Sequence, residues 1–286
     1  MATAAEVRVG ADEVDLASGL LWGAGVTALS EEAGPDGAVL LRVDLPPGGV
    51  ASLEAAVGGR WPVVAVEVDD GVAGWRAHAR VVRAGPVVVH PPWVPLGEVA
   101  PGEVVVEIDP GPSFGHGAHP TTRLCLAALA RILADPSDGE SPANRPPTGV
   151  SDPAVLDVGC GSGVLAVAAV VLGAPSAVAV DVDPAAVAAT RDNARRNGVD
   201  DRVTVPPAGA TPLTGVDGTF PVVVANIGAA ALRELAPALV ARVAPGGTLV
   251  LSGLLDPRPA DLAAAFAPLA VAADDRLDGW TALTLR

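Results

Sequence analysis

The chain has 286 residues, a length that fits one large domain or two ordinary ones. Half of the residues are hydrophobic and only 3% are aromatic, with no Tyr, so the composition excludes a disordered chain and indicates a core built from Ala, Val and Leu. The 18 basic residues are all Arg and face 33 acidic residues, and the net charge of -15 disfavours nucleic acids and anionic membrane surfaces while permitting a basic protein partner.

The first ninety residues alternate short strand-like and helix-like runs. Strands are predicted at 6–9, 38–45 and 63–68, and helices at 11–21 and 50–57. Residues 1–15 contain neither a basic nor an apolar region typical of a signal peptide, so we expect none. The pattern predicts a small α+β domain over residues 1–90.

A Pro-rich passage at 86–101 follows this domain. Prolines such as Pro91 and Pro92 disfavour both a helix interior and a central strand, so we interpret residues 91–103 as a linker. The second domain is expected to run from 104 to 286, with a flexible insertion at 135–153 that is rich in Pro, Ser, Asp and Gly.

Strand and helix signals alternate through the second domain. A helix is expected at 123–134, and after the insertion strands are expected at 155–158, 177–181, 222–225 and 248–251, with helices at 164–172, 184–197 and 229–243. Alternation of this kind predicts an α/β fold with a doubly wound, mostly parallel sheet. The uncharged stretch 158–180 is long enough for a membrane span, but its glycines and Pro175 divide it, which favours buried sheet elements.

A glycine-rich loop follows the strand at 155–158. Gly159, Gly161 and Gly163 alternate with other residues, and glycines let a backbone turn tightly and approach a ligand at the free N–H groups of the next helix. Val164 stands where a dinucleotide fingerprint requires Gly or Ala, which weakens an NAD interpretation.

An acidic residue follows the next apolar strand. Asp181 is placed where a carboxylate can accept both hydroxyls of a ribose. The alternative is that Asp181 or Asp183 caps the helix that begins at Pro184. The loop and the acid occur in the order used by S-adenosylmethionine-dependent methyltransferases, so the sequence predicts an adenosyl cofactor.

Other polar residues could complete a site. Asn226 ends an apolar strand at the ligand-binding edge of the sheet, although it could instead cap the following helix. His116 and His119 lack a Cys or carboxylate at ligand spacing, so we expect no metal, but His119 could line the site. Cys125 and Cys160 are expected to be reduced thiols, as in a cytoplasmic protein.

The second domain resembles the ribosomal protein L11 methyltransferase family over about residues 75–286. The most specific match is the stretch Phe114-Gly115-His116-Gly117-Ala118-His119-Pro120-Thr121-Thr122, and further matches occur at 109–111, 157–163, 181–184, 193–199, 225–227 and 232–237. The chain departs from the usual pattern at His116, Pro221 and Gly228, where the family commonly has Thr, Asp and Leu.

This resemblance implies S-adenosyl-L-methionine as cofactor, contacted by Thr122, Gly159, Asp181 and Asn226, with Gly161 and Gly163 in the same loop. It also implies a seven-stranded methyltransferase sheet and an N-terminal domain that docks the ribosomal protein. The expected activity is methylation of Lys side chains or the N-terminal α-amine of ribosomal protein L11, by a cytoplasmic monomer that contacts neither membrane nor nucleic acid.

The chemistry of methyl transfer places few demands on catalytic groups. The acceptor amine must be neutral, which at pH 7.4 costs about 4 kcal/mol for a free Lys and about 0.5 kcal/mol for an α-amine. We therefore expect positioning and desolvation to matter most, with no single indispensable base. Alternatives are a methyltransferase for another protein or a small molecule, a non-catalytic cofactor-binding regulator, and an NAD enzyme.

Overall fold

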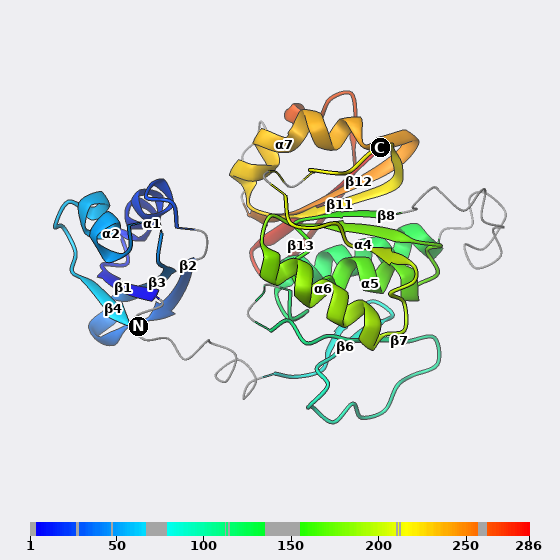
Figure 1. Cartoon of the computed structure of the whole chain (residues 1–286), viewed down its shortest axis with the longest axis horizontal. Coiled ribbons are helices and arrows are strands. Elements are labelled where there is room, and N and C mark those ends of the chain that lie inside the picture. Colours follow the sequence, from blue (N-terminus) through cyan, green and yellow to red (C-terminus); the bar gives the residue numbers. More distant parts are fainter. Residues whose placement is uncertain are drawn as a thin grey trace. The chain divides into compact units, whose positions relative to one another are not determined.

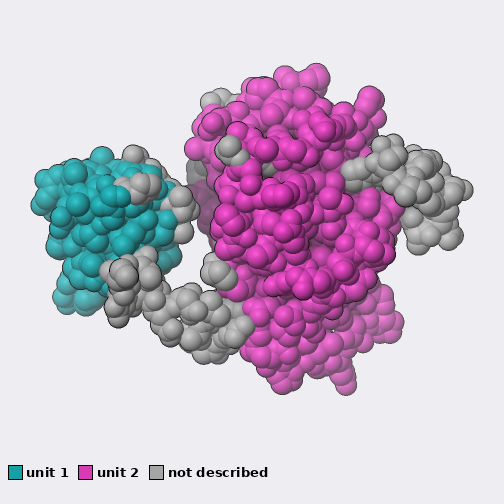
Figure 2. Space-filling view, in the orientation of Figure 1, with its two compact units in different colours: residues 1–75 teal, residues 76–286 magenta. Residues whose placement is uncertain are grey.

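The computed structural model describes residues 4–26, 29–46, 48–66, 79–111, 113, 115–134, 155–209, 211, 213–256 and 262–286. The chain divides into two compact units, residues 1–75 and 76–286 (Figure 2). The division falls earlier than the boundary at residue 90 expected from the sequence, and each unit has a hydrophobic core of its own.

The first unit is an antiparallel sheet with two helices on one face (Figure 1). The strand order is β2-β3-β1-β4, with bounds β1 Ala4–Val9, β2 Leu29–Ala33, β3 Val39–Asp44 and β4 Val63–Val66. The helices are α1 Val14–Gly23 and α2 Val50–Val57. Alternate strand residues such as Val7, Leu41 and Val43 are buried against the helices, as expected for a sheet with one covered face. The predicted α+β arrangement is confirmed, although β2 was not predicted.

The second unit is built on a seven-stranded sheet of order β10-β9-β8-β11-β12-β14-β13. The strands are β8 Val155–Val158, β9 Ala177–Val180, β10 Val203–Thr204, β11 Phe220–Asn226, β12 Val243–Leu255, β13 Val271–Leu277 and β14 Trp280–Leu285. The first five in that order run parallel, whereas β14 is antiparallel to both of its neighbours. The predicted seven-stranded sheet is confirmed.

Helices cover both faces of this sheet (Figure 1). They are α4 Pro120–Ala134, α5 Val164–Val171, α6 Pro184–Arg196 and α7 Ala229–Ala241. Residues of α4 and α5 share one core with Val155 and Val224, whereas α7 shares a second core with Leu156 and Val223. Neighbouring strand residues thus enter opposite cores, so the sheet separates two apolar layers.

The strands of a smaller sheet flank the predicted linker at 91–103. Its order is β5-β6-β7, with β5 Val82–Ala84, β6 Val87–His90 and β7 Val104–Glu107. Pro86 and Pro91 flank β6 without interrupting it, and the division between the units falls before residue 76, so the predicted hinge at 86–101 is corrected. Residues 91–103 connect β6 to β7 within the second unit. Residues of β6 and β7 belong to the same core as α4 and α5.

The uncharged stretch 158–180 is divided as predicted, into the end of β8, a loop, α5 and β9. Within the described ranges, none of the helices has the length and apolarity that a membrane crossing requires. The predicted insertion at 135–153 lies outside the described residues.

Candidate cofactor and active site

The glycine loop turns sharply between β8 and α5, at the carboxyl edge of the parallel strands. Gly159, Gly161 and Gly163 have φ values of 75°, 53° and 78°. The backbone N–H groups of Gly159 and Cys160 both donate to the carbonyl of Val180, at 2.9 and 3.1 Å. These bonds fasten the loop to the end of β9, the strand that leads directly to Asp181.

Two of the glycines are required by packing within the protein. A Cβ atom on Gly159 would lie 2.4 Å from Cγ2 of Ile227, and one on Gly163 would lie 2.6 Å from Cγ2 of Thr190. The sequence-based argument assigned this free space to a ligand. The structure instead fills it with the end of β11 and with α6, so the loop is held in shape from both sides.

The first turn of α5 also differs from expectation. We predicted free N–H groups pointing at a ligand, but Val164 N–H donates to Oγ of Ser162 at 3.3 Å and Ala166 N–H donates to Oδ2 of Asp157 at 3.1 Å. Helix termini commonly satisfy their donors with nearby side chains, and that is what limits the free donors here.

Asp157 is the buried acid of the site. Its side chain is fully buried, and its Oδ1 atom is without a hydrogen-bond partner within the described structure. Burial raises the pKa of Asp157 to about 7; the N–H of Ala166 opposes that shift, and the charge of Asp181 adds to it. The sequence signal for this residue was a single acid inside an otherwise apolar strand, and our site prediction did not include it.

Asp181 is anchored from two sides. Its Oδ2 accepts the N–H of Gly161 at 2.9 Å, and its Oδ1 accepts the N–H of Asp183 at 3.0 Å. A carboxylate accepts about four hydrogen bonds, so capacity is left for two ribose hydroxyls. Asp183 caps α6 by accepting the N–H of Ala185 at 2.8 Å, which confirms the capping interpretation for Asp183.

Thr122 and Asn226 come together although 104 residues separate them. Nδ2 of Asn226 lies 3.5 Å from Oγ1 of Thr122, joining the end of β11 to the first turn of α4. The N-cap of α7 is Gly228, so the alternative in which Asn226 caps that helix is wrong. Both residues lie at the carboxyl edge of the sheet, where ligands of open α/β folds bind.

His119 packs between α4 and the last hairpin. Its Nδ1 atom lies 2.7 Å from Oγ1 of Thr121 and accepts the N–H of Thr121 at 3.3 Å, while its ring makes a T-shaped contact with the ring of Trp280, with centroids 4.8 Å apart. The sequence analysis did not anticipate Trp280. The sequence signal for the hairpin that carries Trp280 is the Asp278-Gly279 pair, which is typical of tight turns. In the structure both residues have positive φ, as such a turn requires.

The two histidines favour neutral imidazoles. Burial lowers the pKa of His119, and burial followed by the charges of His119 and Arg80 lowers that of His116. Among the residues that the structure describes, no three His, Cys, Asp or Glu side chains form a group that could hold a metal. Cys125 and Cys160 are both buried free thiols.

The doubly wound sheet carries its glycine loop and the anchored Asp181 at the carboxyl ends of neighbouring parallel strands. This fold and site define the class of S-adenosylmethionine-dependent methyltransferases. Residues 54–286 match the family model described as ribosomal protein L11 methyltransferase (PrmA). The chain belongs to this family, and its cofactor is S-adenosylmethionine.

Individual relatives agree with the family match. Ribosomal protein L11 methyltransferase of Citrifermentans bemidjiense is 45% identical over 227 residues, which is 79% of this chain and 70% of that protein. The protein of the same name in Geobacter sp. strain M21 is 44% identical, with the same coverage. The crystal structure of a ribosomal protein L11 methylase from Lactobacillus delbrueckii subsp. bulgaricus superimposes with a TM-score of 0.59 at 28% identity, covering 72% of this chain and 98% of that one.

Proposed function

We propose that the enzyme methylates amino groups of ribosomal protein L11, either Lys side chains or the N-terminal α-amine. The observation that carries the proposal is the match of residues 54–286, which include the glycine loop, Asp181, Thr122 and Asn226, to a family described by that activity. The relatives that align with most of this chain carry the same name.

The cofactor residues have separable roles in this proposal. Asp181 would hold the ribose, the loop from Gly159 to Gly163 would hold the adenosyl side, and Asn226 with Thr122 would hold the methionine end or orient the amine. When bound, the cofactor supplies an activated methyl group. The protein contributes orientation and exclusion of water, because displacement at a methyl carbon requires the amine and the donor in line.

The acceptor amine must reach the site without its proton. Deprotonating a free Lys at pH 7.4 costs about 4 kcal/mol, and an apolar environment lowers that cost by disfavouring the ammonium form. His119, directly before α4, packs against Trp280, and burial favours the neutral form of its ring. We propose that these two rings form a wall of the site beside the first turn of α4. We propose that this wall desolvates the amine and that no single base is indispensable.

We also propose that the first unit docks the substrate. Residues 1–75 contain twelve acidic residues and three Arg, an excess that would attract a basic protein. Most of this unit lies before residue 54, where the family match begins. Raising the salt concentration should therefore lower kcat/KM for L11 without changing the affinity for S-adenosylhomocysteine.

The deciding experiment supplies labelled S-adenosylmethionine and ribosomal proteins from cells that lack this enzyme, followed by mass spectrometry of the products. Label on L11 amines is the expected result. Label on another protein, or on small amines added in parallel, would transfer the proposal to that substrate class. Tight cofactor binding without turnover in any of these mixtures would indicate a regulator. We also propose that the enzyme is cytoplasmic and monomeric.

A further inference from the structure

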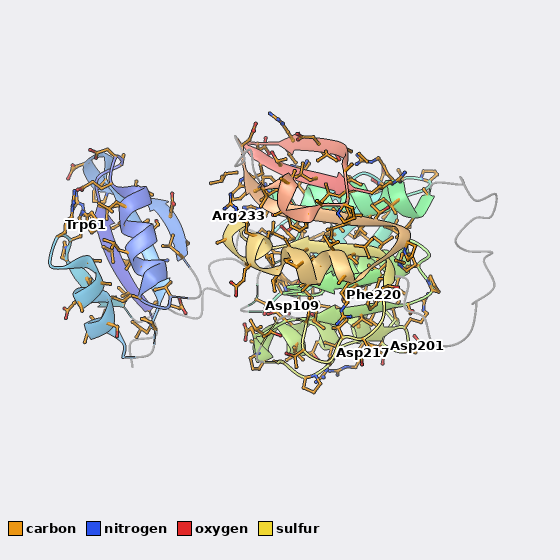
Figure 3. The ribbon with its side chains drawn as sticks, turned by 90° about the horizontal axis from the view of Figure 1, so that it is seen from above. Trp61, Asp109, Asp201, Asp217, Phe220 and Arg233 are labelled. Carbon is orange, nitrogen blue, oxygen red and sulfur yellow. The ribbon has the colours of Figure 1, made fainter. Side chains whose placement is uncertain are left out.

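Two amide side chains at the end of α6 form hydrogen bonds with the backbone of β7 and of the residues after it. Each side chain bonds both the N–H and the carbonyl of one residue, as the backbone of a neighbouring strand would. Asn197 accepts the N–H of Glu107 at 2.8 Å and donates to its carbonyl at 2.7 Å. Asn193 accepts the N–H of Asp109 at 3.0 Å and donates to its carbonyl at 2.9 Å (Figure 3 labels Asp109).

The two amides differ in their third hydrogen bond. Asn197 donates to the carbonyl of Asn193, within its own helix, at 2.8 Å. Asn193 donates instead to the carbonyl of Ser162, in the centre of the glycine loop, at 2.9 Å. Asn193 is fully buried, whereas Asn197 is half-buried. Asn193 therefore connects the chain at Asp109 directly to the cofactor loop, and Asn197 does not.

A second bond joins the same two parts of the chain. Oγ of Ser162 donates to the carbonyl of Gly115 at 2.8 Å, and Gly115 has a φ of 106°. A Cβ atom on Gly115 would lie 2.6 Å from Oγ of Ser162, so only glycine at this position permits the Ser162–Gly115 hydrogen bond. Ser162 is thus linked to Asp109 through the side chain of Asn193, which its carbonyl accepts, and bonds Gly115 directly through its hydroxyl.

We infer that Asn193 is a positioning residue for cofactor binding: it sets the register of the segment from Asp109 to Thr122 against the glycine loop. The segment, described at 109–111, 113 and 115–122, ends at Thr122, which faces Asn226. A segment linked to Ser162 through Asn193 at Asp109 and directly at Gly115 would bring Thr122, seven residues after Gly115, to a fixed place relative to Gly159 and Asp181. The inference rests on the proposed role of these residues as cofactor contacts.

The test compares Asn193→Ala with Asn197→Ala in the full-length protein. Each variant loses the two hydrogen bonds that its amide makes to the N–H and carbonyl of one backbone residue, and we expect similar losses of thermal stability. Only Asn193→Ala should raise the Kd for S-adenosylhomocysteine, measured by calorimetry, by about tenfold, the value of one or two net hydrogen bonds. Asn197→Ala should stay within about twofold of the native protein.

Two further measurements separate positioning from general damage. In the cofactor-free protein, Asn193→Ala should speed hydrogen exchange in peptides covering 115–122, and Asn197→Ala should not. Ser162→Ala removes the bond to Gly115 but keeps the carbonyl that Asn193 uses, so its Kd should rise less than in Asn193→Ala. When Asn193→Ala and Ser162→Ala are combined in one protein, their effects on the free energy of binding should be less than additive.

Equal Kd values for the two Asn variants would overturn the inference. If Asn193→Ala does not fold, an unchanged Kd in Ser162→Ala would do so. Failure of the native protein to bind S-adenosylhomocysteine would instead contradict the cofactor contacts themselves, which is a separate result.

Discussion

The two units differ in whether polar side chains are buried in their interiors. In the parts of the chain that the structure describes, every buried polar or charged residue belongs to the second unit: Thr121, Thr122, Asp157, Ser162, Thr190, Asn193, Thr248, Ser252, Thr281 and Thr284. The core of the first unit consists of aliphatic side chains and Trp61, whose indole N–H donates to Glu13.

This difference reflects what each unit must hold in place. An apolar core with surface ion pairs stabilises a small sheet, because apolar burial needs no directional partners. The second unit must fix loops at the carboxyl edge of its sheet, and hydrogen bonds from buried side chains to backbone do this with defined geometry. Substitutions of the residues that fix these loops in the second unit should therefore affect cofactor affinity, whereas substitutions in the first unit should leave that affinity unchanged.

The largest contrast is expected between two glycines with positive φ. Gly159→Ala forces a Cβ atom to within 2.4 Å of Ile227, whereas Gly58→Ala in the first unit meets nothing within 4 Å. Left-handed strain and overpacking together should cost about 2–5 kcal/mol at Gly159, against about 1–2 kcal/mol of strain alone at Gly58. Denaturant unfolding measures both, and cofactor affinity should fall only in Gly159→Ala. Equal losses in the two variants would contradict the packing argument.

The next contrast lies within the acid pair that follows β9. Asp181→Ala removes the anchor of Gly161 N–H and the proposed ribose acceptor, so the Kd for S-adenosylhomocysteine should rise about 100-fold, the value of two hydrogen bonds to a charged group. Asp183→Ala removes only the cap of α6 and should cost about 1 kcal/mol of stability. Calorimetry on both variants checks this, and a weaker effect at position 181 than at 183 would reverse the assignment.

The sequence predicted most of the elements near the site because their apolar runs are unbroken. Helix α2 and strand β8 were placed at their observed bounds, since each is an apolar run with a clear glycine or polar boundary. Strands β2 and β13 were missed because charged residues occupy positions that face solvent. A hairpin between β13 and β14 could have been found from Asp278-Gly279, a pair typical of tight turns.

The site was predicted less completely than the fold. Sequence spacing predicted Gly159, Asp181 and Asn226 as ligand contacts because ligands of open α/β folds bind at strand ends, and all three lie at that edge of the sheet. The bonds from Asn193 to both Asp109 and Ser162 depend on how α6 lies against the end of β7, which no local pattern encodes. The raised pKa of Asp157 is also a product of tertiary burial.

The buried Asp157 should make the stability of the second unit depend on pH. Its pKa is raised from 3.8 to about 7 in the folded protein, so between these values the unfolded state releases a proton that the folded state retains. Stability should therefore fall as the pH rises from about 4 to 7, by up to about 4 kcal/mol, and level off above 7. Asp157→Asn should remove this slope, which urea unfolding at several pH values measures. A difference between variant and native protein that is constant from pH 5 to 8 would contradict the raised pKa.

The smallest effect is expected at the surface of the first unit. Glu13 accepts hydrogen bonds from Trp61 at 3.0 Å and from Arg60 at 2.7 Å, tying the start of α1 to the residues after α2 (Figure 3 labels Trp61). These two partners lower the pKa of Glu13, so its contribution is present above pH 4.5 and is lost as the pH falls below it. Glu13→Gln keeps the acceptor for Trp61 but loses the ion pair.

Hydrogen exchange in peptides of α1 and β1 should rise modestly in Glu13→Gln at pH 7, and stability measurements on this variant and the native protein should converge at low pH. Asp36→Asn is the matched control, because Asp36 is far more exposed and its pair with Arg8, at 3.4 Å, should contribute nothing measurable. The affinity for S-adenosylhomocysteine should stay unchanged in both variants, since neither residue belongs to the unit that carries the glycine loop. A change in that affinity in Glu13→Gln would mean that the first unit influences the cofactor site, and the separation of roles between the two units would then be wrong.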